Sequence, residues 1–504
     1  MSQKVTLFPF VKKSDKHTGL SNDSSTVSAY TFIIIDPKRA ERMINMSNTF
    51  KENMQAFAVK QVLHYIDEDP ERGLPKLLDW AEKFNKSDRF EKMLKPFHAI
   101  LEDPDNNWNR LLKSLWTDIA PEVRKVFFEN FVVNTALIGT PRQEKWKEKH
   151  GCNIPWAILM DLTSACNLKC TGCWAAEYGH KLNLEYEVLD DIIRQGTEMG
   201  TYMYIFSGGE PLVRKNDIIR LCEAHPDCEF LAFTNGTLID EAFADEMLRV
   251  KNFVPAISIE GFEEATDDRR GKGTYQKVMN AMRILKEKKL PFGASCCYTS
   301  RNIDSLSSEE YMDSLVNAGA KFAWFFHYMP VGNEAVPELL PTPEQREIMY
   351  HKIRGYRQTK PIFTIDFQHD GEFVGGCIAG GRSYLHINAN GDIEPCAFIH
   401  YADSNIRQHT LLEAYKRPLF MAYKDGQPFN HNMLRPCPML ENPECLRDMV
   451  KRSGAHSTDM QSPENIDDLY GKCKPYADNW VSKADELWKA SHSCAGCTGC
   501  GQKD

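Results

Sequence analysis

Residues 161–175, DLTSACNLKCTGCWA, bring Cys166, Cys170 and Cys173 together on one short segment. The chain has 504 residues and 16 cysteines, and the first 151 residues contain none of them. The amino terminus lacks the long apolar run of a signal peptide, and no stretch reaches the length of a membrane span, so we expect a cytoplasmic protein. A disulfide framework is not expected in that reducing compartment, and thiols clustered in this way indicate metal ligation.

The bulk composition limits the class of protein. A chain of this length holds two or three domains. Apolar residues make up 42%, which excludes a wholly disordered chain. The net charge of −9 argues against a general nucleic-acid binder, so no nucleic-acid partner is expected.

The pattern along the chain predicts three regions: an N-terminal helical domain (1–150), a core (151–335) and an irregular C-terminal domain (336–504). Apolar residues in FEKMLKPFHAIL (90–101) follow one helix face. The most apolar piece, VFFENFVVNTALIG (126–139), predicts a core helix. The alternative is a surface that meets lipid or an apolar substrate, which implies peripheral membrane contact.

Six short apolar runs in the core region alternate with amphipathic stretches. This alternation predicts an α/β unit with a parallel sheet, in which chemistry collects at the carboxyl ends of the strands. The three-cysteine cluster follows the first run directly, so we expect it at that end. The runs are 156–163, 201–207, 229–234, 254–260, 291–299 and 321–328.

Cys-x3-Cys-x2-Cys supplies three metal ligands from one loop. Structural zinc takes four protein ligands, and catalytic zinc takes three plus water. A [4Fe–4S] cluster normally takes four thiolates, so three leave one iron open. Spacing alone leaves zinc and iron both open.

The second run ends in Ser207-Gly208-Gly209-Glu210-Pro211. The two glycines let backbone approach a ligand closely, and a carboxylate beside them can take an ammonium group. CNLKCTGC followed by SGGEP resembles the radical S-adenosylmethionine (radical SAM) enzymes. The resemblance implies a partial (β/α)6 barrel in which the three cysteines hold a [4Fe–4S] cluster and S-adenosylmethionine chelates the fourth iron. One electron, from a reductant such as ferredoxin or flavodoxin, then breaks the sulfonium bond, and the 5′-deoxyadenosyl radical takes a hydrogen atom from substrate.

The same resemblance implies the residues that bind S-adenosylmethionine, whereas no catalytic residue is assigned. One departure is Gly172, because the position before the third cysteine is usually aromatic; Trp174 is the expected substitute. The implied cofactor-binding residues are Ser207, Gly208, Gly209, Glu210, Thr234, Asn235, Ser258, Glu260, Arg270, Met329, Pro330 and Val331.

The C-terminal cysteines predict one or two further metal sites. Cys377, Cys396, Cys437 and Cys445 resemble the opening of a SPASM or Twitch auxiliary-cluster domain, which implies an auxiliary [4Fe–4S] cluster; zinc on the same four residues is the alternative. A second set is Cys473, Cys494, Cys497 and Cys500, which could bind a cluster or zinc or form a partly unliganded tail.

Between the two strands of a predicted hairpin (386–396) lies Asn390-Gly391, a strong turn signal. The remaining residues of interest, read as core or pocket residues, are Cys222, Cys228, Cys296, Cys297, His327, His369, His386 and His400.

The predicted function is therefore an oxidoreductase that cleaves S-adenosylmethionine and abstracts a hydrogen atom from a small-molecule, lipid or peptide substrate. Lipid alkyl C–C coupling and peptide modification are the two alternatives for the reaction. A tunnel of apolar side chains beside Cys166–Cys173 would favour lipid, and a shallow polar groove would favour peptide. A non-enzymatic iron–sulfur carrier is a third hypothesis, and SGGEP argues against it because a carrier needs no cosubstrate pocket.

Overall fold

The computed structural model describes residues 98–492. Most of the predicted N-terminal helical domain, including all but the last four residues of FEKMLKPFHAIL, lies outside the described residues. The same holds for the tail cysteines Cys494, Cys497 and Cys500.

One mostly parallel sheet of nine strands organises the chain, in the order β7-β6-β5-β4-β3-β2-β1-β8-β9. All six predicted strands are present, so the predicted α/β class is confirmed. Neighbouring strands from β7 to β8 are parallel, and only β9 is antiparallel to its neighbour. The strands are β1 (Ala157–Thr163), β2 (Met203–Gly208), β3 (Glu229–Thr234), β4 (Phe253–Ser258), β5 (Gly293–Tyr298), β6 (Phe322–His327), β7 (Phe363–Asp366), β8 (Tyr384–Ile387) and β9 (Ile393–Glu394), with β10 (Tyr401–Ala402) and β11 (His456–Ser457) forming a separate pair.

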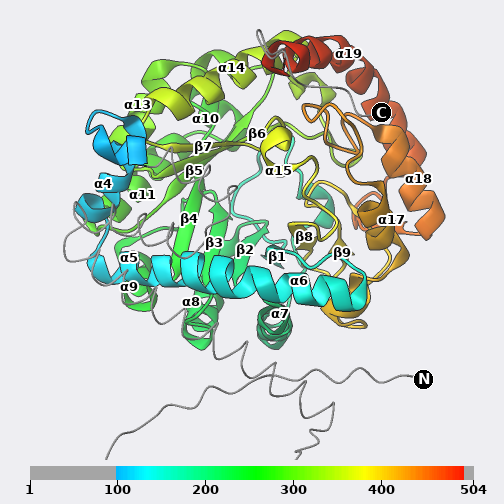
Figure 1. Cartoon of the computed structure of the whole chain (residues 1–504), viewed down its shortest axis with the longest axis horizontal. Helices are drawn as coiled ribbons and strands as arrows, with labels where there is room; N and C mark the ends of the chain where they lie inside the picture. The colour runs from blue at the N-terminus through cyan, green and yellow to red at the C-terminus, as the bar shows by residue number, and fades with distance from the viewer. Residues whose placement is uncertain (1–97, 493–504) are drawn as a thin grey trace, which may run out of the picture. The chain divides into compact units, whose positions relative to one another are not determined.

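Helices lie outside the curved sheet (Figure 1). Helix α7 shows why: Leu189, Ile192 and Ile193 share one buried face, and the helix ends at Gly200 in the left-handed conformation that glycine favours. The α-helices are α4 (Asn107–Asp118), α5 (Pro121–Phe127), α6 (Thr140–His150), α7 (Tyr186–Met199), α8 (Lys215–Ala224), α9 (Glu241–Val250), α10 (Glu263–Arg270), α11 (Thr274–Glu287), α12 (Ile303–Leu306), α13 (Glu309–Ala318), α14 (Pro343–Thr359), α15 (Gly371–Val374), α16 (Leu411–Ala414), α17 (Pro418–Gly426), α18 (Pro443–Ser453) and α19 (Ile466–His492). The described residues also contain a π-helix, η1 (Phe128–Gly139), three 3₁₀-helices, η2 (Ala176–Tyr178), η3 (Pro211–Arg214) and η4 (Pro337–Leu339), and a helical segment over 98–102.

The sheet separates two apolar cores because alternate residues of a strand point to opposite faces. In β2, Tyr204 and Phe206 pack in the core shared with the outer helices. Met203 and Ile205 pack on the other face, together with C-terminal residues such as Tyr423. The inner face of the barrel is therefore closed by the C-terminal part of the chain.

Strands β7, β8 and β9 lie beyond residue 335 and join the same sheet as the core. The predicted hairpin is confirmed: β8 and β9 pair with His386 opposite Glu394, and Gly391 in the turn has a φ of +88°. The predicted boundary at residue 335 stays a prediction.

The expected core helix over 126–139 is helical, but it is buried along one face only. Most of the buried side chains of η1 are polar: Asn130, Asn134 and Thr135 are buried, together with Val133. Their side chains satisfy carbonyls, with Asn130 donating to the Cys228 carbonyl at 2.9 Å and Asn134 donating to the Asp227 carbonyl at 2.9 Å. Hydrogen bonding to the loop before β3 therefore helps to hold this segment in place, together with the buried side chain of Val133.

None of the helices within residues 98–492 combines the length and the apolar character needed to cross a membrane.

Candidate active site

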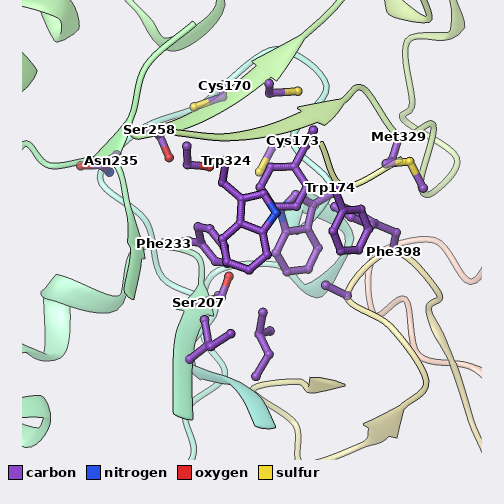
Figure 2. Close-up of a pocket in the computed structure, with 18 of the residues that line it drawn as sticks. Cys170, Cys173, Trp174, Ser207, Phe233, Asn235, Ser258, Trp324, Met329 and Phe398 are labelled. Atoms are coloured by element: carbon purple, nitrogen blue, oxygen red, sulfur yellow. The ribbon is translucent and has the colours of Figure 1, made fainter. Parts of the chain in front are cut away.

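The three clustered cysteines lie in the loop that follows β1. They line one side of a cavity of about 230 Å³ inside the barrel. The backbone N–H of Leu168 donates to the Cys166 Sγ at 3.4 Å. Figure 2 shows Cys170 and Cys173 at this end of the cavity. Three thiols facing one cavity form the donor set that an iron–sulfur cluster with one open iron requires.

The two glycines after β2 place the end of that strand directly against the cysteine loop. The Gly209 N–H donates to the Thr163 carbonyl at 2.9 Å, and the Glu210 N–H donates to the Ala165 carbonyl at 2.8 Å. A Cβ added at Gly209 would lie 2.3 Å from the Ala165 carbonyl oxygen, so no side chain fits there. The glycines therefore allow two backbone segments to approach each other closely. The prediction of a ligand-binding pair did not include this role.

Glu210 lines the cavity, and its carboxylate ties the end of β2 to the end of β3. It accepts hydrogen bonds from the Leu212 N–H at 2.9 Å, the Thr234 hydroxyl at 2.6 Å and the Asn235 N–H at 2.7 Å. Burial raises the pKa of Glu210, and these hydrogen bonds oppose that rise. Each carboxylate oxygen has two lone pairs, so the group keeps capacity to accept from a ligand ammonium.

Two arginines from α10 fix the far side of the cysteine loop. The Arg269 carbonyl accepts from the Thr171 N–H at 2.9 Å, and the Arg270 guanidinium lies 4.0 Å from the Cys170 Sγ. Both arginines form ion pairs with the buried carboxylate of Glu260. Glu260 therefore positions positive charge beside a thiol, where it favours the thiolate.

The pKa values of Cys166 and Cys170 are raised in the absence of metal. Burial, with smaller contributions from Glu210, Cys170 and Cys173, raises the pKa of Cys166 to about 11. Burial also raises the pKa of Cys170, against the lowering effect of Arg270. Because thiolates are the ligands of iron, cluster binding has to release the protons of these thiols.

An aromatic ring occupies the space beside Gly172, but it comes from elsewhere in the chain. Gly172 has a φ of +66°, and a Cβ there would lie 2.6 Å from the ring of Tyr328, which follows β6. Trp174 instead contacts Phe398, His386 and His400 with ring centroids 5.6 to 6.1 Å apart. The sequence suggested Trp174 as the substitute and missed Tyr328.

The structure gathers most of the implied cofactor-binding residues around the cavity. Thr234, Glu260, Pro330 and Val331 do not line it; the first two support residues that do. The residues that line it are Ser207, Gly208, Gly209, Glu210, Asn235, Ser258, Arg270 and Met329. Their roles stay predictions.

Aromatic side chains form the rest of the cavity wall. Trp324 and Phe326 of β6 stack with centroids 5.6 Å apart, and Phe233 of β3 meets Trp324 edge-on at 5.3 Å. Phe398 and Trp174 approach from the opposite side (Figure 2). None of these was predicted as a site residue except Trp174. The signal was present in KFAWFFHY, since residues 322, 324 and 326 alternate along one face of a strand.

Of the cysteines read as core residues, Cys222, Cys228 and Cys296 are buried as expected. Cys297 differs, because it is half-buried and lines the cavity beside Arg269. The four histidines are buried, and three of them pair with acids: His369 with Asp366, His386 with Asp161 and Glu394, and His400 with Asp459.

A second cavity of about 110 Å³ is lined by Cys377, Cys396 and Cys437. The Cys437 sulfur accepts from the backbone N–H groups of Met439 and Leu440, at 3.4 and 3.5 Å. Burial raises the pKa of Cys377 to about 11 and that of Cys396 to about 12.

The phenol of Tyr423 lies among all four predicted auxiliary ligands. Its hydroxyl is buried and has no hydrogen-bond partner in the described part of the chain. Burial raises its pKa, and so do Cys377, Cys396, Cys437 and Cys445, in that order. Buried hydroxyl groups are normally hydrogen-bonded, so the unpartnered Tyr423 hydroxyl fits a bound group that would accept its hydrogen bond at this position.

Cys473 lies apart from these sites. It is fully buried in α19, and burial raises its pKa to about 12. Its predicted co-ligands lie beyond residue 492, so that site stays a prediction. Within residues 98–492, no three Cys, His, Asp or Glu side chains converge closely enough to hold a single metal ion.

Known proteins share sequence and fold similarity with this chain. Residues 160–312 match the Radical SAM superfamily model. The AdoMet-dependent heme synthase of Methanosarcina barkeri is 23% identical over 292 residues, covering 52% of this chain and 83% of that protein. The PqqA peptide cyclase of Granulibacter bethesdensis is 24% identical over 289 residues, covering 54% of this chain and 76% of that protein. The structure of Streptococcus suis SuiB bound to S-adenosylmethionine covers 63% of this chain and 84% of its own at 17% identity, with a TM-score of 0.50, a similarity of fold.

Proposed function

We propose that the chain is a radical SAM enzyme that abstracts a hydrogen atom from an apolar group of its substrate, because residues 160–312 match the Radical SAM superfamily model and similar proteins are enzymes. One observation carries this proposal: the three cysteines and the glycine pair line the same cavity as a wall of aromatic side chains. In this proposal the cysteine end of the cavity binds the cosubstrate, and the aromatic wall binds the substrate.

Cys166, Cys170 and Cys173 hold a [4Fe–4S] cluster in this proposal, and Gly209, Glu210, Asn235 and Ser258 surround its open side. The bound cluster supplies the reductive cleavage of S-adenosylmethionine. Glu210 accepts hydrogen bonds from the amino group of the cosubstrate while it keeps the ends of β2 and β3 together. Arg270 offsets the negative charge of the thiolates next to Cys170.

The substrate is proposed to be held by hydrocarbon contact. Phe233, Trp324, Phe326 and Phe398 face the cavity, and their rings offer no formal charge to orient a polar ligand. Apolar side chains exclude water around a reacting carbon, which protects a radical from side reactions. An aromatic and aliphatic wall suits an alkyl chain or a planar ring system, so the cavity favours lipid alkyl chemistry over a shallow peptide groove.

An auxiliary [4Fe–4S] cluster is proposed at Cys377, Cys396, Cys437 and Cys445. Three of these thiols, Cys377, Cys396 and Cys437, line a cavity together with Tyr423 rather than converging on one point, which favours a cluster over the zinc alternative. Tyr384 lies 2.6 Å from the Cys396 sulfur, and the N–H groups of Met439 and Leu440 donate to Cys437. These groups stabilise the thiolate forms that a cluster requires.

Modification of a peptide is the second candidate, because one similar protein is a PqqA peptide cyclase. In this case an aromatic or aliphatic side chain of the peptide, rather than a lipid chain, would enter the cavity.

The cluster assignment is tested with Cys170→Ala in protein purified without oxygen. We expect the variant to lose all release of 5′-deoxyadenosine from S-adenosylmethionine and to keep iron at the C-terminal site. The matched control is Cys228→Ala, which removes a buried core thiol remote from both cavities and should keep cleavage. Undiminished cleavage in Cys170→Ala would refute the assignment.

The substrate is identified by mass spectrometry of lipid and peptide pools incubated with the active enzyme. Deuterium transferred from a labelled pool into 5′-deoxyadenosine marks the carbon attacked. Transfer from alkyl lipid supports the first candidate, and transfer only from peptide supports the second.

A further inference from the structure

A fully buried arginine on α14 bonds to two segments that line the second cavity. The Arg346 side chain has no exposed surface, and its guanidinium carbon lies 3.9 Å from the ring centroid of Trp480 on α19. Arg346 is in the wall of neither cysteine-lined cavity. What this residue does therefore has to follow from the groups that it bonds.

The guanidinium holds the loop of Cys437 through one carboxylate. Its Nη2 donates to Glu441 Oε1 at 2.7 Å, and neither side chain of this ion pair is exposed to solvent. The other oxygen, Oε2, accepts from the Cys437 backbone N–H at 2.7 Å. The Cys437 carbonyl in turn accepts from the N–H groups of Glu441 and Asn442, at 3.1 and 3.0 Å. Residues 437–442 therefore form a closed turn whose carboxylate is fixed by Arg346.

The same guanidinium also holds the end of β7. Its Nε and Nη2 atoms lie 3.3 and 3.2 Å from His369 Nε2, and His369 Nδ1 lies 2.9 Å from Asp366 Oδ2. Asp366 is the last residue of β7 and lines the second cavity, as Cys437 does. One side chain of α14 is thus connected to two parts of the wall of one cavity.

Stability alone is a weak explanation for this arrangement. A buried ion pair contributes little relative to well-packed apolar residues, because both charges lose their hydration. Arginine suits the position for another reason: its planar group presents several N–H donors in fixed directions, so it can bond a carboxylate and an imidazole at once. The bonds fix where the turn of Cys437 lies relative to the end of β7.

We propose that Arg346 and Glu441 are positioning residues for the metal site of the second cavity. They hold the turn of Cys437 against the end of β7 and set the charge beside that thiol. Glu441 places a negative charge next to Cys437, and Arg346 offsets it. Reduction adds negative charge to an iron–sulfur cluster, so the two residues act on its potential in opposite directions. The effect on the potential rests on the proposed auxiliary cluster, whereas the positioning of the turn does not.

The test uses EPR-monitored redox titration of the full-length, cluster-loaded protein. Glu441→Gln should raise the potential of the auxiliary cluster, because a nearby negative charge is removed. Arg346→Gln should lower it, because Glu441 is then no longer offset. The double variant should lie close to the unaltered protein. A merely structural role would loosen the site in both single variants and shift them in the same direction.

Two further variants separate charge from shape. Arg346→Lys keeps the positive charge but lacks the planar group, so it should recover most of the potential that Arg346→Gln loses. Lys321→Gln is the matched control: it also removes an ion-paired positive charge, the partner of Asp118, and Lys321 lines neither cavity. It should leave the potential unchanged. Iron lost from the second site of Arg346→Gln and retained in Arg346→Lys would equally support the proposal.

Hydrogen exchange of residues 437–442 tests the positioning directly. In protein purified without oxygen, this segment should exchange about threefold faster or more in Glu441→Gln and Arg346→Gln, because the acceptor of the Cys437 N–H is lost or released. Lys321→Gln should exchange as the unaltered protein does. The proposal is overturned if neither variant exchanges faster, or if both shift the potential in the same direction or not at all. If Arg346→Gln does not fold, an unchanged or lowered potential in Glu441→Gln overturns it alone.

The two proposals fail separately. Absence of iron from the second cavity of the unaltered protein would refute the auxiliary cluster and, with it, the effect on its potential. Hydrogen exchange of residues 437–442 would still decide whether Arg346 and Glu441 hold the turn. If the cluster is present and the exchange rates do not change, the cluster stands and the positioning role is refuted.

Discussion

The backbone of Gly209 lies so close to the cysteine loop that a single methyl group disturbs it. In Gly209→Ala the new Cβ would lie 2.3 to 2.5 Å from the backbone of Ser164 and Ala165. We expect a loss of about 1–3 kcal/mol in the free energy of unfolding of the metal-free protein. Gly355→Ala on α14 is the control, since nothing lies within 4 Å of its Cβ, and it should stabilise by about 0.5–1 kcal/mol. Chemical denaturation measures both, and equal effects would contradict the packing described here.

Tyr423 is expected to set the reduction potential of the proposed auxiliary cluster. Its phenol is an unpartnered donor that lines the second cavity with three of the four thiols, and hydrogen bonds to cluster sulfurs stabilise the more negative, reduced state. Tyr423→Phe should load iron normally and lower the potential by about 50 mV in an EPR-monitored titration, the size of one modest hydrogen bond. Tyr415→Phe removes another buried, unpartnered hydroxyl that lies beside Cys152, and it should leave the potential unchanged. A shift of equal size in both variants would rule out a specific role.

At the scale of single residues, the sequence predicted the parts of the site that are close together along the chain. Cys166 to Cys173 share one loop, and SGGEP follows the next strand, so both appear as motifs. Tyr328 and Cys297 could not be found in this way. They reach the cavity from β6 and β5, more than a hundred residues from the cysteines, and only the closure of the barrel brings them there.

The pairing of β1 with β8 is held by a buried charge cluster that makes stability depend on pH. His386 lies between Asp161 at 3.0 Å and Glu394 at 2.6 Å. Burial alone would lower the pKa of His386, but the two carboxylates outweigh it and raise the pKa to about 10. The unfolded chain titrates near pH 6.5, so the stabilisation is complete below that pH and is lost as the pH rises through about 10. Thermal unfolding across this window should show a falling midpoint.

The variant His386→Gln tests the assignment of this pH dependence. It leaves Asp161 and Glu394 without the positive charge between them, so we expect a loss of about 3–5 kcal/mol at neutral pH. The slope between pH 6.5 and 10 should then become shallower. His351→Gln, at an exposed position on α14, should keep the slope of the unaltered protein. An unchanged slope in His386→Gln would assign the effect to another group.

Among whole elements, the six strands and the β8–β9 hairpin were predictable because a strand of the parallel sheet is a short apolar run and Asn-Gly marks a tight turn. The partial burial of η1 was not predictable. Its composition is that of a core helix, and the burial of its polar side chains depends on the carbonyls of the loop before β3, which accept hydrogen bonds from Asn130 and Asn134. The joining of β7 and β8 to the core sheet likewise depends on partners distant in sequence.

The whole molecule is arranged so that two cysteine-lined cavities meet at one layer of side chains. Both cavities are lined by Trp324, Met329, Phe367, Ile378, Tyr384 and Phe398. The C-terminal part of the chain closes the inner face of the barrel and supplies the second cavity in the same packing arrangement. A substrate held by the aromatic wall would therefore lie between the two proposed clusters.

This arrangement predicts that the two sites can be separated by mutation. Cys437→Ala removes a thiol of the second cavity and leaves the cysteine loop after β1 untouched, so the variant should lose the auxiliary iron and still release 5′-deoxyadenosine. Substrate conversion should fail at a later step, because the electron exchange that the auxiliary cluster would provide is missing. Iron analysis, 5′-deoxyadenosine release and product mass measured on one preparation distinguish these steps. Cys222→Ala, a buried thiol of the outer core, should keep all three near the level of the unaltered protein. If Cys437→Ala retained its full iron content, the second cavity would not be a cluster site; if it retained full product formation without that iron, the cluster would have no part in the reaction.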